Sequence, residues 1–460
     1  MGKKEIIYNS EVAVVGFGRA GQAMVRYLHQ SGAAVRVSDL RRYDELSKAE
    51  QALLDECGAV FEGGEHRASF LEGAELVVVS PGVDYRHLAL VQARKSGARI
   101  AGELAVAAGR FDAPVIAVTG TNGKTTVTEL IGALFAAAGK NVFVGGNIGT
   151  PIGEYLLSDD AYDAVVLEVS SFQLELCGDF APDVGILLNI SPDHLDRHGT
   201  LENYAAAKMN IFGGERTYSV SNGDDPLCRR FADDTAGLQP AWFGHDAGFD
   251  AAIDGSRIVV RQALVYDLEG SKLDNLSGRL NSAAALLGLV PFNLDPQCIQ
   301  AALKSFEPGE HRLHEVDRID GVVFINDSKA TNTGAVKNAI MQVGGAIILI
   351  AGGRDKGDDY ALLRNSVAAH VKHLMLIGEA AHAIGAILGD LAPVDYPATL
   401  EDAVTRAAEI AEPGDRVLLS PACASFDMFD NYQQRGRCFI DAVQGLRGRT
   451  TAAGTMGGMQ

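Results

Sequence analysis

The chain has few cysteines, and their spacing suggests no partners. No two of them form a Cys-x-x-Cys pair; they stand at Cys57, Cys177, Cys228, Cys298, Cys423 and Cys438. This pattern indicates neither a disulfide framework nor a zinc site, and it fits a reducing cytoplasm. Long apolar runs are also missing, and the start, Met1 to Ile7, lacks the apolar core of a signal peptide. We therefore expect a cytoplasmic protein with no membrane insertion.

Basic residues are in deficit. Lysine and arginine total 40 against 59 aspartates and glutamates, which gives a formal net charge of −19. Such an excess argues against binding to nucleic acid or to anionic membranes. It leaves room for a small anionic substrate, which needs only a local basic pocket.

The length and the hydrophobic pattern predict several α/β units in series. An apolar content of 47% in 460 residues is enough for large cores and about three domains. Apolar runs alternate with amphipathic helical stretches, which is typical of parallel sheets covered on both faces. The expected strands are Val12–Val15, Val35–Ser38, Leu76–Ser80, Val115–Val118, Ala164–Val169, Val184–Ile190, Val322–Asn326, Ala346–Ala351, His373–Ile377 and Arg416–Ser420.

Glycine or proline interrupts this pattern near Gly109–Ala113 and Phe306–Glu310. We therefore expect domains at 1–110, 111–308 and 309–460. Residues 240–280 are predicted to form short strands and turns, as an antiparallel edge of the middle unit. The end of the chain, from Thr450 to Gln460, is predicted to be a frayed tail.

The most informative segment is Val115-Ile-Ala-Val-Thr-Gly-Thr-Asn-Gly-Lys-Thr-Thr126. A β-branched run leads into a glycine loop, and a helix is predicted from about Lys124 to Ala138. Loop N–H groups and the positive helix end would converge on one anion. Lys124 would supply a charge for phosphates, and Thr125 a hydroxyl for Mg²⁺. Because two residues separate Gly120 from Gly123, where a Walker loop has four, an ordinary turn is the competing interpretation.

Three further residues have open interpretations. Glu168 ends an apolar strand and would complete a Mg²⁺ site if that strand neighbours the phosphate loop; otherwise it faces water. His194 lies just after a strand. It could be a metal ligand or a helix cap, but the simplest interpretation is a surface residue. Lys208 lies on a predicted helix among small neighbours, where a lysine usually extends to solvent. Partly desolvated beside bound cations, it would have a lowered pKa and could form a carbamate.

Gly16-Phe-Gly-Arg-Ala-Gly21 follows the first predicted strand, and Asp39 ends the second. Alone, this fingerprint suggests an NAD-dependent oxidoreductase. The glycine turn recognises a pyrophosphate, however, and a UDP-sugar carries one too. We favour the UDP-sugar, because no hydride-transfer residues follow downstream; a Rossmann shell that binds nothing is the remaining alternative. The pocket would be lined by Gly18, Asp39, Arg41, Ser80 and Gly82.

The motifs together closely resemble those of the Mur ligases, the ATP-dependent amide-forming enzymes of peptidoglycan precursor synthesis. The resemblance runs from about residue 12 to 437. It rests on Gly120–Thr126, Gly145–Gly149, Leu167–Leu174, Asn189–Asp196, Glu310–Arg312, Asn326–Asn332, Gly352–Lys356 and Leu419–Asp427. The Asn-Asp-Ser-Lys-Ala-Thr-Asn and Ser-Pro-Ala-Cys-Ala-Ser-Phe-Asp forms favour the member that adds D-glutamate to UDP-N-acetylmuramoyl-L-alanine.

The resemblance implies a Rossmann-like N-terminal domain for the UDP-sugar, a P-loop-type central ATPase, and a mobile Rossmann-like C-terminal domain that completes the site. It implies two Mg²⁺ ions, one at Thr125 and Glu168, the other at His194 and a carbamoylated Lys208. We expect a monomer, although no motif indicates the oligomeric state. The implied catalytic residues are Lys124, Glu168, His194 and Lys208. The implied ATP contacts are Gly120, Thr121, Asn122, Gly123, Lys124, Thr125, Thr126, Asn281, Arg312 and Asp327. Asn147 would contact the substrate, and the incoming amino acid would be held by Lys329, Thr331, Lys356, Ser425 and Tyr432.

The chain departs from the family where members commonly carry His-Asn-x-x-Asn. Asn281 is kept, but Leu280 and Ala284 replace the other two residues. Gly309-Glu310 replaces a Leu-Pro, and Tyr432 a phenylalanine, changes that look tolerable. The first departure puts the adenine contacts in doubt and leaves open a nucleotide-sugar-binding regulatory protein without turnover. Retention of Lys124, Glu168, His194 and Lys208 argues against that alternative. No motif in the sequence indicates whether the amino acid is D- or L-glutamate.

Overall fold

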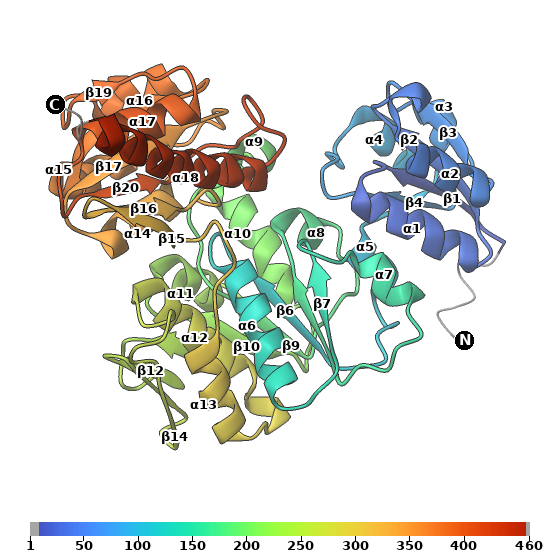
Figure 1. The fold of residues 1–460 in the computed structure, drawn as a ribbon. Coiled ribbons are helices and arrows are strands. Elements are labelled where there is room, and N and C mark those ends of the chain that lie inside the picture. The colour runs from blue at the N-terminus through green and yellow to red at the C-terminus, as the bar shows by residue number, and fades with distance from the viewer. Residues whose placement is uncertain (1–8, 457–460) are drawn as a thin grey trace. The chain divides into compact units, whose positions relative to one another are not determined.

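A computed structural model describes residues 9–456, and within them the strands form three sheets (Figure 1). In the first sheet the order is β3-β2-β1-β4-β5, all parallel. The strands are β1 (Glu11–Val15), β2 (Ala34–Asp39), β3 (Val60–Gly63), β4 (Leu76–Val79) and β5 (Arg99–Ala101). Alternate residues of β1 enter two separate apolar clusters, so both faces of this sheet are covered, as the continuous apolar runs predict.

Helices connect these strands. They are α1 (Arg19–Gln30), α2 (Lys48–Glu56), α3 (Ala68–Leu71), α4 (Leu88–Lys95) and α5 (Glu103–Ala107). α5 leads out of the first sheet toward the second, and its preceding residue Gly102 donates its N–H to the carbonyl of Leu176 at 2.9 Å. The connection between the two sheets is therefore itself packed and hydrogen-bonded.

The second sheet has the order β14-β13-β12-β11-β10-β9-β6-β8-β7. Its strands are β6 (Val115–Thr119), β7 (Val142–Gly146), β8 (Ala164–Glu168), β9 (Val184–Leu187), β10 (Tyr218–Asn222), β11 (Ala241–Gly244), β12 (Ala251–Asp254), β13 (Arg257–Val260) and β14 (Leu264–Asp267). Only the pairs β12–β13 and β13–β14 are antiparallel among those described. The predicted antiparallel edge is confirmed, although its last residues belong to helix α12 (Leu276–Gly288) instead.

The remaining helices of this part of the chain lie between β6 and β15 in sequence. They are α6 (Lys124–Ala137), α7 (Ile152–Leu157), α8 (Ser171–Glu175), α9 (Leu195–His198), α10 (Leu201–Met209), α11 (Pro226–Asp233) and α13 (Pro296–Ser305). β6 is buried along its whole length and lies between β8 and β9. The connection after β6 leads toward β7 on one side, and the connection after its neighbour β9 leads toward β10 on the other side. The loop after β6 therefore lies at a topological switch point, where open parallel sheets bind ligands.

The third sheet has the order β15-β16-β20-β17-β18-β19. The strands are β15 (His314–Ile319), β16 (Val322–Asn326), β17 (Ile347–Gly352), β18 (Val371–Ile377), β19 (Val394–Asp395) and β20 (Arg416–Leu419), with β15 antiparallel to β16. Its helices are α14 (Thr333–Val343), α15 (Arg364–His370), α16 (Ala381–Leu388), α17 (Leu400–Ile410) and α18 (Tyr432–Met456). The tail predicted from Thr450 is wrong in part, because α18 continues to Met456; residues 457–460 lie outside the described residues.

Contacts divide the chain into two compact units. One holds the first two sheets; the other holds the third sheet together with Ser191–Leu201 and Asn275–Gly278. The segment that contains His194 therefore groups with the third sheet, although it follows a strand of the second. No helix within residues 9–456 is both long and apolar enough to cross a membrane.

Candidate active site

The loop between β6 and α6 has the geometry of an anion cradle. Gly123, the residue before α6, has a φ of +87°, and a Cβ built there would lie 2.7 Å from Oδ1 of Asn281. Only glycine fits this left-handed position at the start of the helix. Lys124 opens α6 and donates its Nζ to the carbonyls of Gly120 and Thr121 at 2.8 and 2.9 Å. The amides of the helix start and this ammonium together supply the positive field that a phosphate needs.

Asn189 holds the loop from the neighbouring strand end. Its backbone carbonyl accepts from the N–H of Thr121, its Oδ1 accepts from the N–H of Asn122, and its Nδ2 donates to the carbonyl of Asn122, all at 2.8–3.0 Å. The sequence placed Asn189 inside a motif but assigned it no role. The sequence did offer a signal for this role, because Asn189 is a polar residue that directly follows an apolar strand.

Glu168 and Thr125 form a buried oxygen pair beside this loop. β8 runs parallel to β6, so the Glu168 carboxylate lies next to α6, and Thr125 Oγ1 donates to Glu168 Oε2 at 2.6 Å. Asn147 donates its Nδ2 to the other carboxylate oxygen at 2.7 Å. Glu168 is thus not the water-facing residue of the simpler interpretation, since its exposure is 1%.

This pair fits Mg²⁺ by the chemistry of its donors. Hydroxyl and carboxylate oxygens are ligands that Mg²⁺ accepts, and it usually takes only one or two protein ligands and completes its shell with phosphate oxygens and water. Within the described residues, three or more His, Cys, Asp or Glu side chains nowhere gather around a possible metal. An ion held by Thr125 and Glu168 would therefore need phosphate oxygens or water to complete its coordination.

Lys208 does not extend to solvent, so that interpretation is wrong. The side chain is 1% exposed, and its Nζ donates to the carbonyl of Gly120 at 2.8 Å. The ammonium also lies 4.5 Å from the centre of the Tyr204 ring, whose hydroxyl donates to Thr121 Oγ1 at 3.1 Å. Tyr204 and Lys208 are four residues apart on α10, so one helical face contacts the phosphate loop twice. That spacing was visible in the sequence, whereas the burial depends on tertiary packing.

His194 precedes α9 with a left-handed backbone, at a φ of +55°. Its side chain makes no capping hydrogen bond to the helix, which removes the helix-cap alternative. The ring Nε2 lies 3.7 Å from Oδ2 of Asp193, and the side chain is 40% exposed. Its role as a metal ligand stays a prediction.

In the second compact unit, Asp193 pairs with Lys356, one of the residues predicted to hold the amino acid. Lys356 Nζ lies 2.9 Å from Asp193 Oδ1, and Asn332 donates its Nδ2 to Oδ2 at 3.0 Å. Burial alone would lower the pKa of Lys356, but the Asp193 carboxylate outweighs burial and raises that pKa above its ordinary value. Lys356 is therefore a cation, as a partner for a carboxylate must be. Sequence reasoning gave Asp193 no role.

The other predicted amino-acid residues lie on neighbouring loops of the third sheet. The Nζ of Lys329 lies 4.1 Å from the centre of the Tyr432 ring, a cation–π contact. Ser425 is buried and Thr331 is half-buried. The structure thus places all five predicted residues in one compact unit.

Asp327 and Arg312 lie at the end of β16. Asp327 accepts from Ser420 Oγ at 3.0 Å and from the N–H of Leu313 at 3.2 Å. Burial raises the pKa of Asp327 to about 7, against the opposing effect of these hydrogen bonds. Arg312 keeps a buried nitrogen, Nη2, without a hydrogen-bond partner among the described residues. Buried donors are usually paired, so Nη2 is available to a further acceptor, and the nucleotide contact of Arg312 stays a prediction.

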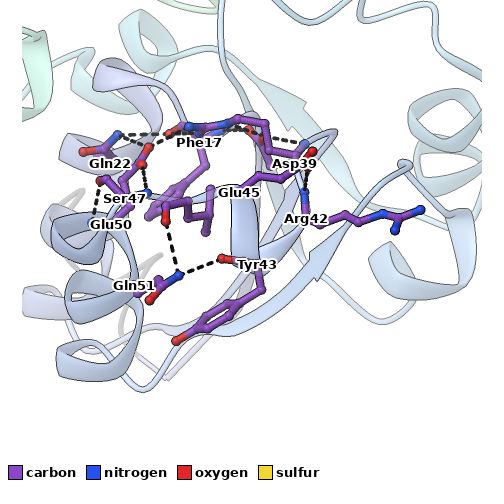
Figure 2. Close-up of polar contacts among 11 residues, drawn as sticks. Phe17, Gln22, Asp39, Arg42, Tyr43, Glu45, Ser47, Glu50 and Gln51 are labelled. Atoms are coloured by element: carbon purple, nitrogen blue, oxygen red, sulfur yellow. Dashed lines mark hydrogen bonds and ion pairs between the residues drawn. The ribbon is translucent and has the colours of Figure 1, made fainter.

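The predicted UDP-sugar residues lie on the first sheet and its loops, and Figure 2 shows the polar contacts around one of them, Asp39. Asp39 accepts from the N–H of Phe17 at 2.6 Å with one oxygen and from Arg41 N and Nε at 2.9 and 3.0 Å with the other. These hydrogen bonds outweigh burial and lower the pKa of Asp39. One oxygen thus holds the glycine loop at Phe17 and the other holds Arg41, whereas the dinucleotide interpretation requires this carboxylate for a ribose.

Glycines keep the same loop tight. A Cβ on Gly21 would lie 2.0 Å from the carbonyl of Gly16, so the helix starts directly against the turn. Ser80 closes the turn by donating its Oγ to that carbonyl at 2.8 Å. By contrast, nothing lies within 4 Å of a Cβ built on Gly18 or Gly82. The open backbone at these two positions suits close approach of a ligand, and their role stays a prediction.

The departures at Leu280 and Ala284 have a packing explanation. Both lie on α12, where Ala284 is fully buried and Leu280 packs partly buried against the core of the second sheet. Asn281, on the same helix, faces the phosphate loop at Gly123 instead. At these two positions the side chains serve apolar packing, which explains the departures without assigning them a role toward adenine.

Comparison with known proteins matches three stretches of the chain to Mur ligase families. These are a Mur ligase MurD-like N-terminal domain over residues 10–102, a Mur ligase middle domain over 118–279, and a Mur ligase glutamate ligase domain over 311–423. A protein of Desulfotalea psychrophila named UDP-N-acetylmuramoylalanine–D-glutamate ligase is 47% identical over 95% of this chain and 96% of its own. One of the same name from Geotalea uraniireducens is 41% identical over 96% and 98%.

Solved structures show the same fold. The MurF ligase of Thermotoga maritima in complex with ADP has a TM-score of 0.60 at 18% identity, covering 96% of this chain and 97% of its own. The three α/β sheets and their order along the chain agree with this architecture. With relatives at this identity along nearly its whole length, the chain belongs to the Mur ligase family.

Proposed function

We propose that this chain is an ATP-dependent ligase that joins D-glutamate to UDP-N-acetylmuramoyl-L-alanine through an acyl phosphate, in peptidoglycan precursor synthesis. The similarity to relatives of that name along all three sheets carries the proposal. The Thr125–Glu168 pair beside the phosphate loop supports it, because phosphoryl transfer needs a phosphate cradle and a metal site at one place.

The first half-reaction brings two anions together. The carboxylate of the nucleotide sugar attacks the γ-phosphate of ATP and displaces ADP, which leaves an acyl phosphate. The loop amides and the Lys124 ammonium offset the repulsion and the charge of the transition state. Bound Mg²⁺ would add charge neutralisation and a template for the phosphate oxygens. Thr125 and Glu168 would hold one ion; the second predicted ion, with His194 and a carbamoylated Lys208, stays a proposal.

In the second half-reaction the amine of glutamate attacks the acyl carbon. A tetrahedral intermediate forms and collapses to the amide and phosphate. Lys329, Thr331, Lys356, Ser425 and Tyr432 would hold the incoming amino acid, with the two ammonium groups matching its carboxylates. The attacking amine must be neutral, and the base that takes its proton is unassigned.

The remaining assignments complete the proposal. Residues 1–110 would bind the UDP-sugar with Gly18, Asp39, Arg41, Ser80 and Gly82, residues 111–308 would bind ATP, and residues 309–460 would hold the amino acid and contact the nucleotide through Arg312 and Asp327. The family matches over 10–102, 118–279 and 311–423 support these boundaries. We also propose that the enzyme is a monomer, which light scattering would test.

The deciding experiment measures phosphate release with MgATP and UDP-N-acetylmuramoyl-L-alanine in three lanes, containing D-glutamate, L-glutamate or no amino acid. Release that requires both the nucleotide sugar and D-glutamate is expected. Release with L-glutamate alone would refute the proposed substrate and keep the mechanism. No release in any lane, with the nucleotide sugar still bound, would favour a regulatory protein and direct attention to Leu280 and Ala284.

A further inference from the structure

Three loops of the second compact unit carry the residues proposed to hold the amino acid. The loops follow β16, β20 and β17. These three strands are parallel, and β20 lies between β16 and β17 in the sheet. The loop after β16 carries Lys329 and Thr331, the loop after β20 carries Ser425, and the loop after β17 carries Lys356. Because side chains on separate loops form one site only if the loops are held together, the contacts between these loops matter for binding.

Arg435 ties the first loop to the second. The side chain is 1% exposed and donates from Nε to Ser328 Oγ at 3.0 Å, from Nη2 to the Ser328 carbonyl at 2.9 Å, and from Nη1 to the Cys423 carbonyl at 3.1 Å. Cys423 is thereby fixed two residues before Ser425. It serves as an anchor to which the third loop can attach.

The third loop is secured by its backbone only as far as Arg354. Gly352 donates its N–H to the carbonyl of Pro421 at 2.8 Å, and Arg354 donates to the carbonyl of Ala424 at 2.9 Å. Lys356 lies beyond these bonds. In this part of the loop, Asp355 Oδ1 accepts from the N–H of Gly357 at 2.9 Å and closes a turn around Lys356.

Tyr360 connects that turn to Cys423. The ring is 3% exposed, and its hydroxyl lies 2.9 Å from Asp355 Oδ1 and 3.2 Å from Cys423 Sγ. Burial raises the pKa of the Cys423 thiol to about 12, so the thiol keeps its proton and can donate. A carboxylate only accepts, so the direction is set: Cys423 donates to the Tyr360 oxygen, and the Tyr360 hydroxyl donates to Asp355.

We propose that Tyr360 is a positioning residue for the incoming amino acid: its hydroxyl links the Asp355 turn to Cys423 and so holds Lys356 in register with Ser425. The inference rests on the proposed function, because that function assigns Lys356 and Ser425 to the amino acid. Tyr360 touches no substrate in this account and acts through Lys356. Loss of the Tyr360 hydroxyl should therefore weaken binding of the amino acid and leave binding of ATP and of the nucleotide sugar unaffected.

The test measures KM for each substrate in Tyr360→Phe. We expect KM for the amino acid to rise about three- to tenfold, the effect of one hydrogen bond transmitted through a loop. KM for ATP and for the nucleotide sugar should stay within about twofold of the parent values. Tyr266→Phe is the matched control, since it removes a hydroxyl from another buried tyrosine, in the other compact unit. An unchanged amino-acid KM in Tyr360→Phe, or an equal rise for all three substrates, would overturn the inference.

Two variants of Asp355 keep the test valid if Tyr360→Phe folds poorly. Asp355→Asn retains an oxygen acceptor for the hydroxyl and should leave the amino-acid KM close to the parent value, whereas Asp355→Ala should raise it. Equal KM values for these two variants would contradict the inference. Activity of the parent with L-glutamate in place of D-glutamate would refute only the proposed substrate. A rise in KM for that amino acid in Tyr360→Phe would still support the role of Tyr360.

Discussion

At the scale of single residues, two lysines contact the phosphate loop, and they differ in burial and therefore in the role that each can have. Lys124 opens α6, is half-buried, and lies against the loop carbonyls, where phosphate would compete for it. Lys208 is fully buried below the same loop and shares the Gly120 carbonyl. The half-buried Lys124 can meet a ligand directly, while the buried Lys208 must act with bound ions or through the loop.

Lys124→Ala should abolish turnover while leaving nucleotide-sugar binding nearly intact. The variant removes a charge that faces the transferred phosphate, so kcat should fall by at least about a hundredfold. Phosphate release and calorimetric binding of the nucleotide sugar check the two halves. Lys140→Ala is the control, because Lys140 is a surface lysine paired with Asp163 at 3.2 Å. Simultaneous loss of nucleotide-sugar binding would contradict the assignment of that ligand to the first domain.

Lys208→Ala should also cripple catalysis, but with a different response to added acid. If Lys208 acts as a carbamate, a small carboxylic acid such as formate or acetate should partly restore kcat in the space the side chain leaves. The same acid should have no such effect on Lys124→Ala. Failure of every small acid to restore Lys208→Ala would leave Lys208 as an ordinary buried cation that supports the loop through Gly120.

At the scale of elements, the start of α6 depends on one backbone conformation. Gly123→Ala places a Cβ at a φ of +87° and 2.7 Å from Asn281 Oδ1. We expect a loss of about 1–3 kcal/mol in the free energy of unfolding, together with weaker ATP binding. Gly139→Ala, just beyond the end of α6, is the control, because its φ is +72° but nothing lies within 4 Å of the added Cβ. Both variants carry backbone strain, but only Gly123→Ala adds a clash, so urea unfolding of the two separates these effects. Equal losses in the free energy of unfolding would mean that the contact with Asn281 has no effect on stability.

The elements themselves were largely predictable, and the failures have physical reasons. Val115–Val118 matches β6, and the helix predicted from Lys124 matches α6, because a buried strand and a helix that begins at a glycine loop each leave a local pattern. The short strands β3 and β5 were missed, since three or four residues at the side of a sheet carry too little pattern. The burial of Lys208 was missed for another reason: its neighbours on α10 are ordinary for an exposed helix, and only packing against the loop decides its place.

The contacts of the candidate site also include some that the sequence predicted and some that it could not predict. The sequence predicted the Glu168–Thr125 site on the condition that the strand of Glu168 neighbours the phosphate loop, and the pairing of β8 with β6 meets that condition. The pairing of Asp193 with Lys356 did not, because it joins residues 163 positions apart that no local rule connects. Asn189 and Asp193 both lay within a recognised motif, so a motif can show that a residue matters while its partner stays hidden until the fold brings the two together.

At the scale of the whole molecule, Glu103 links the first two sheets. It begins α5, is 3% exposed, and accepts from Gln173 Nε2 at 2.6 Å with Oε1. Gln173 in turn accepts from Ser170 N and Oγ at 2.8 and 3.0 Å, so the network reaches the segment directly after Glu168. The second oxygen of Glu103, Oε2, has no hydrogen-bond partner among the described residues. Burial raises the pKa of Glu103 to about 7, against the opposing hydrogen bond from Gln173.

This raised pKa predicts how stability depends on pH. The folded state binds the Glu103 proton more tightly than the unfolded state, whose carboxyl has an ordinary pKa of 4.5. The contribution of Glu103 to stability is therefore fully present below about pH 4.5 and is lost as the pH rises toward 7. Glu103→Gln keeps the acceptor for Gln173 and cannot ionise, so it should be more stable than the parent at pH 8 by up to a few kcal/mol. Near pH 4.5 the two proteins should be similar. Urea unfolding at the two pH values measures this difference, and a gain of the same size at both would show that packing at this position, not ionisation of Glu103, separates the two proteins.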